Sequence, residues 1–296
     1  MTPIEAIKPL LNDILENEPM SNHTSFKIGG NAEVLARPKT TEELSKIWQA
    51  CRQHDIPFAI LGDGTNVLVA DEGIRGVVVL TNKMIQLKID GDRIIAAAGV
   101  RLAKLAETAC KAGLAGLAFA SGIPGTVGGA VYMNAGAYGH DISNVCESVK
   151  IQTLAETVIQ PVEQMHFGYR QSKVQEGNQL ILETTFKLTP SDPEKIRKEM
   201  TDLNHQRREK QPLDFPSAGS AFKRPDGHFA SKLIQDSHLK GFQIGDAQVS
   251  EKHAGFIINK GNATAKDVKD LIEAVRQKVY GNFGVWLEPE IRMLGD

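Results

Sequence analysis

The stretch from Gly116 to Gly139 constrains this 296-residue chain most, because it consists largely of glycines and small apolar residues. Glycine is unfavourable inside both helices and strands, so the stretch cannot be one regular element throughout. Gly122, Gly125 and Gly128 recur at every third position. A backbone of this kind suits close contact with a large planar ligand, and the alternative is a close-packed glycine-rich turn.

A second glycine-rich loop, Gly62–Asn66, follows a predicted buried strand at residues 58–61. Its glycines permit positive φ and let consecutive N–H groups converge on an anion such as a diphosphate. A tight β-turn explains the same residues equally well. The chain contains neither GxGxxG nor the P-loop pattern, so this loop is not a known dinucleotide fingerprint.

The composition is typical of a globular protein of two or three domains, with 41% hydrophobic and 24% charged residues. The formal net charge of −2 gives no general attraction to nucleic acid or to anionic membranes. No apolar run approaches the roughly 20 residues that cross a bilayer, and the acidic N-terminal segment does not resemble a signal peptide. We therefore expect a cytoplasmic protein with no nucleic-acid or membrane partner.

Hydrophobic periodicity and turn residues predict the elements of an α+β chain. Helices are expected at residues 3–16, from Thr40 or Thr41 onward, and at 101–112, 194–209 and 264–283. Strands are expected at 58–61, 67–69, 77–80, 148–154 and 180–188, with a hairpin at 85–98. Residues 284–292 are expected to form an apolar strand with Glu288, Glu290 and Arg292 on one face, which is either a solvated face or part of a site.

The remaining candidate residues carry weaker signals. Ser220 lies among small residues without the GxSxG pattern of a hydrolase nucleophile, which favours a proton donor over acyl transfer. Arg170 follows a turn beside an aromatic residue. The eight histidines show no paired ligand spacing, so no metal site is expected. The three cysteines, widely spaced, are expected to be reduced and partly buried.

Several motifs in order along the chain resemble the UDP-N-acetylenolpyruvoylglucosamine reductase family. They are Asn22–Gly30, the Gly62 loop, residues 120–139, Gly168–Ser172, Pro216–Pro225 and Leu287–Ile291. The resemblance implies an N-terminal FAD-binding part of the vanillyl-alcohol-oxidase type (1–190, in two subdomains split near 82) and a C-terminal α/β substrate domain (191–296). Because Ser172 runs almost directly into the strand at Leu180, the chain resembles the shorter class of the family, which lacks an inserted substrate-closing loop.

The resemblance also implies the reaction. NADPH would reduce non-covalently bound FAD, which would then reduce UDP-N-acetylglucosamine enolpyruvate to UDP-N-acetylmuramate for peptidoglycan synthesis. By motif match, Ser220 would protonate the substrate carbon next to the carboxylate, while Arg170 and Glu290 would flank that carboxylate. A carboxyl group in that position would have to be protonated or share a proton.

Binding residues follow from the same match. The diphosphate of FAD would lie on Gly62, Asp63, Gly64, Thr65 and Asn66. The isoalloxazine would be bordered by Ser121, Gly122, Ile123, Gly125, Thr126, Gly128 and Gly129. Arg207 would contact the flavin and Lys210 and Arg224 the UDP-sugar, although all three also suit ordinary solubilising charge. Asp63 stands where the family commonly has a small residue, so its carboxylate is expected to point away from the diphosphate.

Two other functions fit parts of the sequence. An oxidase of alcohols or sugars would use the same flavin domain with oxygen as acceptor. Many such proteins attach the flavin through a histidine, but none lies between His54 and His140, which favours non-covalent FAD. A non-enzymatic nucleotide sensor would bind a UDP-sugar without turnover and would leave Ser220 and Glu290 without a role.

Overall fold

The computed structural model describes residues 1–295, in two compact units that both contain helices and strands. Unit 1 consists of Met1–Ile14, Ala36–Asp63 and Val78–Arg207. Unit 2 consists of Leu15–Leu35, Gly64–Val77 and the chain from Arg208 onward. The mixture of helices with largely antiparallel sheets confirms the predicted α+β class.

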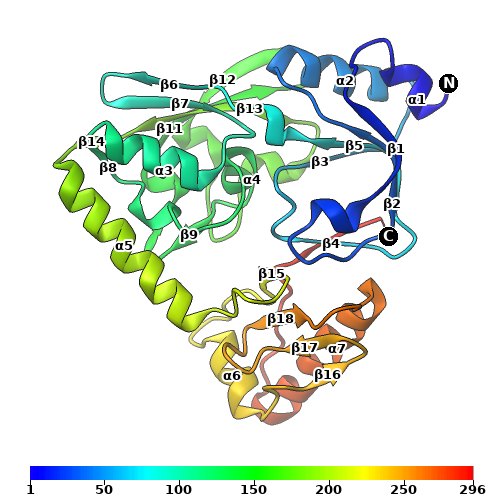
Figure 1. Cartoon of the computed structure of the whole chain (residues 1–296), viewed down its shortest axis with the longest axis vertical. Coiled ribbons are helices and arrows are strands. Elements are labelled where there is room, and N and C mark those ends of the chain that lie inside the picture. The colour runs from blue at the N-terminus through cyan, green and yellow to red at the C-terminus, as the bar shows by residue number, and fades with distance from the viewer. Residues whose placement is uncertain (296) are drawn as a thin grey trace. The chain divides into compact units, whose positions relative to one another are not determined.

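A five-stranded sheet forms the centre of unit 1, with the order β12-β11-β13-β7-β6 and antiparallel neighbours throughout. Its strands are β6 (Leu87–Asp90), β7 (Arg93–Ala97), β11 (Cys146–Gln152), β12 (Thr157–Pro161) and β13 (Leu180–Lys187). The short glycine-rich helix α4 (Val127–Tyr132) packs against β13 and β7 (Figure 1). The predicted hairpin and both predicted later strands are confirmed.

The other elements of unit 1 lie outside that sheet. They are α1 (Pro3–Ile7), α2 (Thr41–Gln53), β3 (Phe58–Leu61), α3 (Leu102–Lys111), β8 (Leu114–Ala115), β9 (Gly136–Ala137), β10 (His140–Asp141), β14 (Thr189–Pro190) and α5 (Pro193–Lys210), whose last turn falls in unit 2. Thr40 caps α2 by accepting a hydrogen bond from the Glu43 N–H, so the helix starts where it was predicted. Its residues Leu44, Ile47 and Trp48 are buried. The helix predicted to stop at Gly113 is α3, and Gly113 has φ +67°.

A further sheet, of order β1-β2-β5-β3, contains β1 (Ile14–Pro19), β2 (Asn31–Ala36) and β5 (Ile74–Leu80). The division of the chain between the two units falls within β2, between Leu35 and Ala36, and within β5, between Val77 and Val78. The strand predicted at residues 77–80 is β5, which begins three residues earlier, at Ile74.

Unit 2 is built on a sheet of order β15-β18-β17-β16. Its elements are β4 (Val67–Val69), β15 (Ser217–Ser220), α6 (Ala230–Asp236), β16 (Gln243–Ile244), β17 (Ala247–Val249), β18 (Phe256–Asn259), α7 (Ala265–Phe283) and β19 (Arg292–Leu294). The long helix α7 packs against β16, β17 and α6 (Figure 1), while β19 pairs in parallel with β4. Among residues 1–295, no helix is long and apolar enough to span a membrane.

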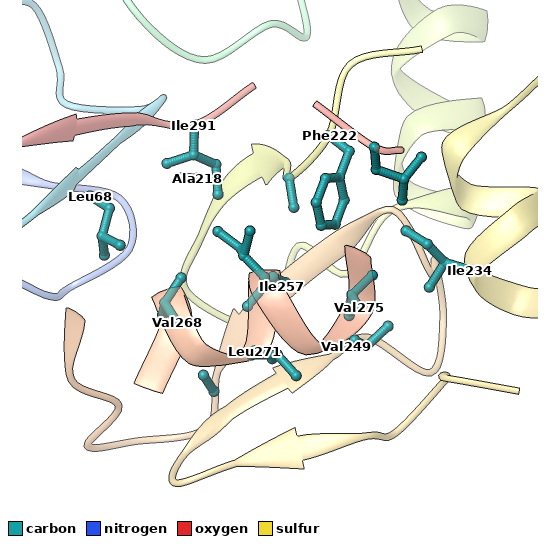
Figure 2. Close-up of a cluster of buried hydrophobic side chains, with 14 of the residues drawn as sticks. Leu68, Ala218, Phe222, Ile234, Val249, Ile257, Val268, Leu271, Val275 and Ile291 are labelled. Carbon is teal, nitrogen blue, oxygen red and sulfur yellow. The ribbon is translucent and has the colours of Figure 1, made fainter. Parts of the chain in front are cut away.

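The helix α7 forms as its sequence predicts. Thr264 and Asp267 make a reciprocal capping box at its start, and Gly284 ends it at φ +68°. Its buried residues include the predicted stripe of Val268, Leu271, Ile272, Val275 and Val279. This stripe lies in the apolar cluster of Figure 2, which also contains Ile257 of β18 and Phe222, two residues after β15.

The same cluster contains side chains from far earlier in the chain. Phe26 is 0% exposed and Leu68 is 1% exposed, and both belong to this core of unit 2. Their burial explains why the compact units have different bounds from the two predicted domains, 1–190 and 191–296. That predicted division concerns cofactor and substrate binding, and as such it stays a prediction.

Two predicted elements are wrong. The helix expected at residues 3–16 ends at Ile7, because Ile14 onward pairs as β1 and Asp13 binds Arg37 and Lys83 through its carboxylate. Although burial raises the pKa of Asp13, the bonds from Lys83 and Arg37 outweigh it and lower that pKa. The strand expected at 284–292 begins only at Arg292, and before it Pro289 makes an isolated bridge to Phe222.

The three cysteines are free and buried, as predicted. Burial raises the pKa of Cys51 to about 11, and burial together with the charge of Glu147 raises the pKa of Cys146 to about 12. These two groups are therefore thiols at neutral pH and poor nucleophiles.

Replacing Phe26 by Ala tests whether the segment Asn22–Gly30 belongs to the core of unit 2. Loss of a fully buried phenylalanine leaves a cavity, so the free energy of unfolding should fall by about 3–5 kcal/mol. Urea unfolding followed by circular dichroism measures the change. Phe242→Ala is the control, because that ring is 40% exposed and its loss should cost much less. Equal losses in both variants would contradict the assignment.

Candidate functional site

The first part of the predicted diphosphate loop is packed tightly against unit 1. Gly62 follows β3, and a Cβ added to it would overlap the Thr126 hydroxyl. Gly64 has φ +60°, and a Cβ there would overlap the His23 carbonyl oxygen within unit 2. Both glycines are thus required by the close approach of the chain to itself, which the tight-turn interpretation also explains. Binding of a diphosphate by this loop stays a prediction.

The hydroxyl of Thr126 is a buried polar atom of unit 1 beside the glycine-rich segment. Thr126 is 1% exposed, and its Oγ1 has no hydrogen-bond partner among residues 1–295. It precedes α4 as the N-cap residue, yet its side chain makes no capping bond. A buried hydroxyl without a partner is costly, so an added hydrogen-bonding group beside Gly62 would satisfy it. This observation fits a polar cofactor at the glycine-rich segment.

The glycines spaced three apart have individual packing reasons. A Cβ on Gly122 would overlap Asn204 Oδ1, and a Cβ on Gly128 would lie 3.0 Å from the Ala98 Cβ. Gly125 has φ +120°, a backbone conformation that residues other than glycine rarely adopt. The structure therefore supports the close-packed turn at these three positions. Their predicted contact with a planar ligand stays a prediction.

Helix α5 holds the start of this segment. The Arg207 guanidinium donates to the Gly122 carbonyl oxygen, and the Asn204 amide donates to the Ser121 hydroxyl over 3.1 Å. Burial lowers the pKa of Arg207 from its ordinary value. Arg207 thus fixes a predicted flavin-bordering residue, whereas its predicted contact with the flavin itself stays a prediction.

Arg170 lies on a tight turn in unit 1. Its φ is +56°, and Gly168 and Gln171 exchange both backbone hydrogen bonds around it. Gln175 donates from Nε2 to the Arg170 carbonyl oxygen over 3.0 Å. The amide of the buried Asn134 donates to the Gly168 carbonyl oxygen over 3.0 Å. A left-handed conformation is unfavourable outside glycine, so these bonds hold Arg170 where the chain alone would not.

In unit 2 the backbone next to Ser220 pairs with the backbone of Glu290. Ser220 ends β15 after a register shift, and Gly219 within that shift has φ +77°. The Glu290 N–H donates to the carbonyl oxygen of Ala221 over 2.9 Å. The two segments remain paired outside the named strands, because the Lys223 N–H donates to the Glu288 carbonyl oxygen over 2.8 Å.

The end of the Gly62 loop joins this arrangement within unit 2. Asn66 donates from Nδ2 to the Glu290 carbonyl oxygen over 3.2 Å, and the Arg292 N–H donates to the Asn66 carbonyl oxygen over 3.0 Å. Glu290 is therefore held through its N–H by Ala221 and through its carbonyl by Asn66. Asn66 Nδ2 already donates a hydrogen bond to the protein. A cofactor would therefore have to contact Asn66 through the remaining N–H of the amide, through Oδ1 or through the backbone.

Ser25 adds a second link. Its N–H donates to the Gly64 carbonyl oxygen over 3.0 Å, and its hydroxyl donates to the Ser217 carbonyl oxygen over 2.7 Å. One residue of the Asn22–Gly30 motif thus ties the glycine loop to the strand that carries Ser220. The sequence marked this motif only through the family resemblance and assigned it no role.

The two predicted substrate cations are exposed. The Arg224 guanidinium carbon lies 4.0 Å from the centre of the Phe229 ring. Lys210 is the last residue of α5, where a positive charge also stabilises the helix dipole. For Lys210 and Arg224, the alternative that they are ordinary solubilising surface charges therefore stays open. Among residues 1–295, no group of three or more His, Cys, Asp or Glu side chains is arranged to hold a metal ion.

Known proteins resemble the chain over nearly its whole length. Residues 32–160 match a family described as FAD binding domain, and residues 211–294 match the UDP-N-acetylenolpyruvoylglucosamine reductase C-terminal domain. A UDP-N-acetylenolpyruvoylglucosamine reductase of Clostridium botulinum strain Hall is 52% identical over 96% of this chain and 94% of its own. One of Caldanaerobacter subterraneus is 49% identical over 99% and 98%.

Solved structures agree with this. The crystal structure of UDP-N-acetylenolpyruvylglucosamine reductase from Thermus caldophilus has a TM-score of 0.81 and 33% identity, covering 95% of this chain and 98% of its own. A glucose dehydrogenase, Phl p 4.0202, has a TM-score of 0.51 at 16% identity over 64% of this chain and 44% of its own, which shows a shared fold alone.

The fold and the FAD-binding match define an FAD-dependent oxidoreductase of the vanillyl-alcohol-oxidase type. Within that class, the chain belongs to the UDP-N-acetylenolpyruvoylglucosamine reductase family. The family resemblance and the fold predicted from sequence are therefore confirmed. The roles of individual site residues are not decided by these matches.

The variant Thr126→Val tests whether the buried hydroxyl of Thr126 forms a hydrogen bond with the cofactor. Valine has the same shape without the unpaired oxygen, so the flavin-free protein should gain about 1 kcal/mol of stability. FAD affinity should fall about ten-fold if the hydroxyl bonds to the cofactor. Urea unfolding of the flavin-free chain and a fluorescence titration with FAD measure the two effects.

Thr184→Val is the matched control, because Thr184 Oγ1 is also buried without a partner among residues 1–295 but lies within β13. It should raise stability similarly and leave FAD affinity unchanged. A Thr126 variant that binds FAD as tightly as the wild type would contradict the assignment.

Proposed function

We propose that this chain reduces UDP-N-acetylglucosamine enolpyruvate to UDP-N-acetylmuramate with NADPH, in the cytoplasm, as a step of peptidoglycan precursor synthesis. The observation that best supports a catalytic role is that the residue after Ser220 pairs with Glu290 in unit 2, since the Glu290 N–H donates to the Ala221 carbonyl oxygen. Ser220 and Glu290 were both candidates from the sequence alone. They stand in a chain of the reductase family with an FAD-binding domain.

Bound FAD supplies the two-electron chemistry that passes reducing equivalents from NADPH to the enol ether of the substrate. The protein supplies the proton and the charge. Reduction at the terminal vinyl carbon leaves negative charge on the neighbouring carbon and its carboxylate, and that charge must be stabilised and then protonated.

Ser220 is the proposed proton donor. Its place at the end of β15, after the left-handed Gly219, exposes its side chain beyond the strand. Hydroxyl groups are weak acids, so a serine serves this role only beside a developing carbanion with cationic support. Arg170 is the proposed cation, because the bonds from Gln175 and the Gly168–Gln171 turn fix its backbone.

Glu290 is proposed to act next to the substrate carboxylate. A carboxylate beside another carboxylate is repulsive, so Glu290 would be protonated or share a proton in the complex. Its backbone is fixed at both polar groups by Ala221 and Asn66, which limits where its side chain can reach.

The binding residues are proposed as the sequence indicates them. The FAD diphosphate is proposed to lie on Gly62–Asn66, and the isoalloxazine on the segment 121–129, with Arg207 at its start. The diphosphate of the UDP-sugar is proposed to bind Lys210 and Arg224, because cations bind phosphate oxygens through charge-assisted hydrogen bonds.

Anaerobic flavin absorbance tests this function. NADPH should bleach the bound flavin, and UDP-N-acetylglucosamine enolpyruvate should then restore its absorbance rapidly without oxygen. Recovery that requires oxygen would support the oxidase alternative and reject the proposed reaction. A protein that binds the sugar nucleotide without any bleaching or recovery would support the sensor alternative.

Ser220→Ala should separate the two half-reactions. Flavin reduction by NADPH should remain within about two-fold of wild type, whereas reoxidation by the sugar substrate should slow by about 10²–10⁴-fold, the usual cost of a lost proton donor. Stopped-flow absorbance measures both rates. Ser231→Ala, on α6, is the control and should change neither. Equal slowing of both half-reactions would exclude the proton-donor role of Ser220.

A further inference from the structure

The acidic residue of the glycine loop has a specific partner in unit 1. Asp63 Oδ2 lies 2.9 Å from Nε of Arg101, and the Asp63 side chain is 15% exposed whereas that of Arg101 is 70% exposed. The Asp63 side chain is therefore largely shielded from water, whereas the Arg101 side chain is largely exposed to it. No role was predicted for Arg101 from the sequence.

The backbone around Arg101 is anchored to the glycine-rich segment. The Leu102 N–H donates to the Gly125 carbonyl oxygen over 3.0 Å, and the Val127 N–H donates to the Val100 carbonyl oxygen over 2.8 Å. Between these two bonds, Arg101 and Thr126 face each other as an antiparallel bridge.

Thr126 also connects this bridge to the glycine loop. Its hydroxyl lies where a Cβ of Gly62 would stand, so the residue before Asp63 packs directly on the residue opposite Arg101. Gly62, Asp63, Arg101 and Thr126 thus form one cluster within unit 1. The position of the Arg101 side chain is set by this backbone frame and by the ion pair.

A carboxylate on a diphosphate loop creates an electrostatic problem. It repels an anion over a distance close to the Debye length, which is about 8 Å at physiological ionic strength. Low exposure of the Asp63 side chain weakens solvent screening and strengthens the repulsion. A guanidinium at 2.9 Å cancels most of this field and also fixes the direction of the carboxylate.

We propose that Arg101 is a positioning residue for FAD binding. It neutralises the charge of Asp63 and holds the Asp63 carboxylate aside. The backbone N–H groups of the loop can then donate hydrogen bonds to the diphosphate oxygens. The inference rests on the proposed role of Gly62–Asn66 as the diphosphate loop. Arg101 acts through Asp63, and its effect should disappear when Asp63 carries no charge.

A double-mutant cycle tests the proposal by fluorescence titration of the flavin-free full-length chain with FAD. Arg101→Met should weaken FAD binding about ten-fold at low ionic strength, because it leaves Asp63 uncompensated, and by less in high salt. Asp63→Asn alone should bind FAD at least as tightly as wild type. The double variant should match Asp63→Asn within about three-fold, the non-additivity expected of a contacting pair.

Two further measurements separate this effect from loss of structure. Riboflavin, which has no phosphate, should bind all four proteins alike, and Arg101→Lys should restore most of the FAD affinity. Arg93→Met breaks an ion pair with Glu147 at 2.7 Å elsewhere in unit 1 and should leave FAD binding unchanged. Thermal unfolding of each flavin-free variant checks that it is folded.

Three outcomes would overturn the proposal. Equal weakening in Arg101→Met and in the double variant would mean that Arg101 contacts FAD itself. An Arg101→Met protein with wild-type FAD affinity would remove any role for it. Riboflavin binding that weakens as much as FAD binding in Arg101→Met would mean that the effect does not act through the diphosphate. Failure of the proposed reaction would appear separately, as a wild-type flavin that the sugar nucleotide does not reoxidise.

Discussion

The burial of one apolar face of α7 organises unit 2. Val268, Leu271 and Val275, which are labelled in Figure 2, are 0% exposed. The cluster that covers them includes Phe26 and Leu68 from the first quarter of the chain. Burying apolar surface is the main favourable term in folding, so this contact decides which segments belong together. Through it the Asn22–Gly30 motif and the end of the glycine loop lie in the same unit as Ser220 and Glu290.

Hydrogen bonds then refine what the core brings close. Ser25 connects Gly64 with Ser217, and Asn66 connects the same loop with Glu290. Each bond is modest in net free energy, about 1 kcal/mol, but each fixes a direction that apolar contact leaves open. The end of the proposed diphosphate loop, the strand that ends in Ser220, and Glu290 are thus parts of one hydrogen-bonded framework in unit 2.

In unit 1 the glycine-rich backbone passes very close to side chains of neighbouring segments. Gly62, Gly122 and Gly128 lack a Cβ where a neighbouring atom stands, and Arg170 is held in a left-handed conformation by its surroundings. The buried Thr126 hydroxyl lies beside Gly62, and the next residue, Asp63, forms an ion pair with Arg101. The segments with the strongest sequence signal are therefore also closely packed, so glycine spacing alone could not separate a ligand contact from a packed turn.

The sequence by itself determined the α+β class, the family, most helices and strands, and the identity of Ser220 and Glu290 as candidates. These depend on local periodicity, on caps such as Thr264 with Asp267, and on motifs that the chain carries in order. Residues 3–16 have helical spacing yet become β1 after Asp13, because pairing with β2 supplies hydrogen bonds that periodicity does not register.

Only the tertiary structure decided which distant residues meet. The alternation in residues 284–292 was correct in part, since Leu287 and Ile291 are buried, but the segment is held by Ala221 and Asn66 rather than by a continuous ladder. Arg101 and Ser25 carry no local signal that marks them as partners of Asp63 and Gly64. Such pairings depend on the folding of segments far apart in sequence, and local residue preferences contain no information about that distance.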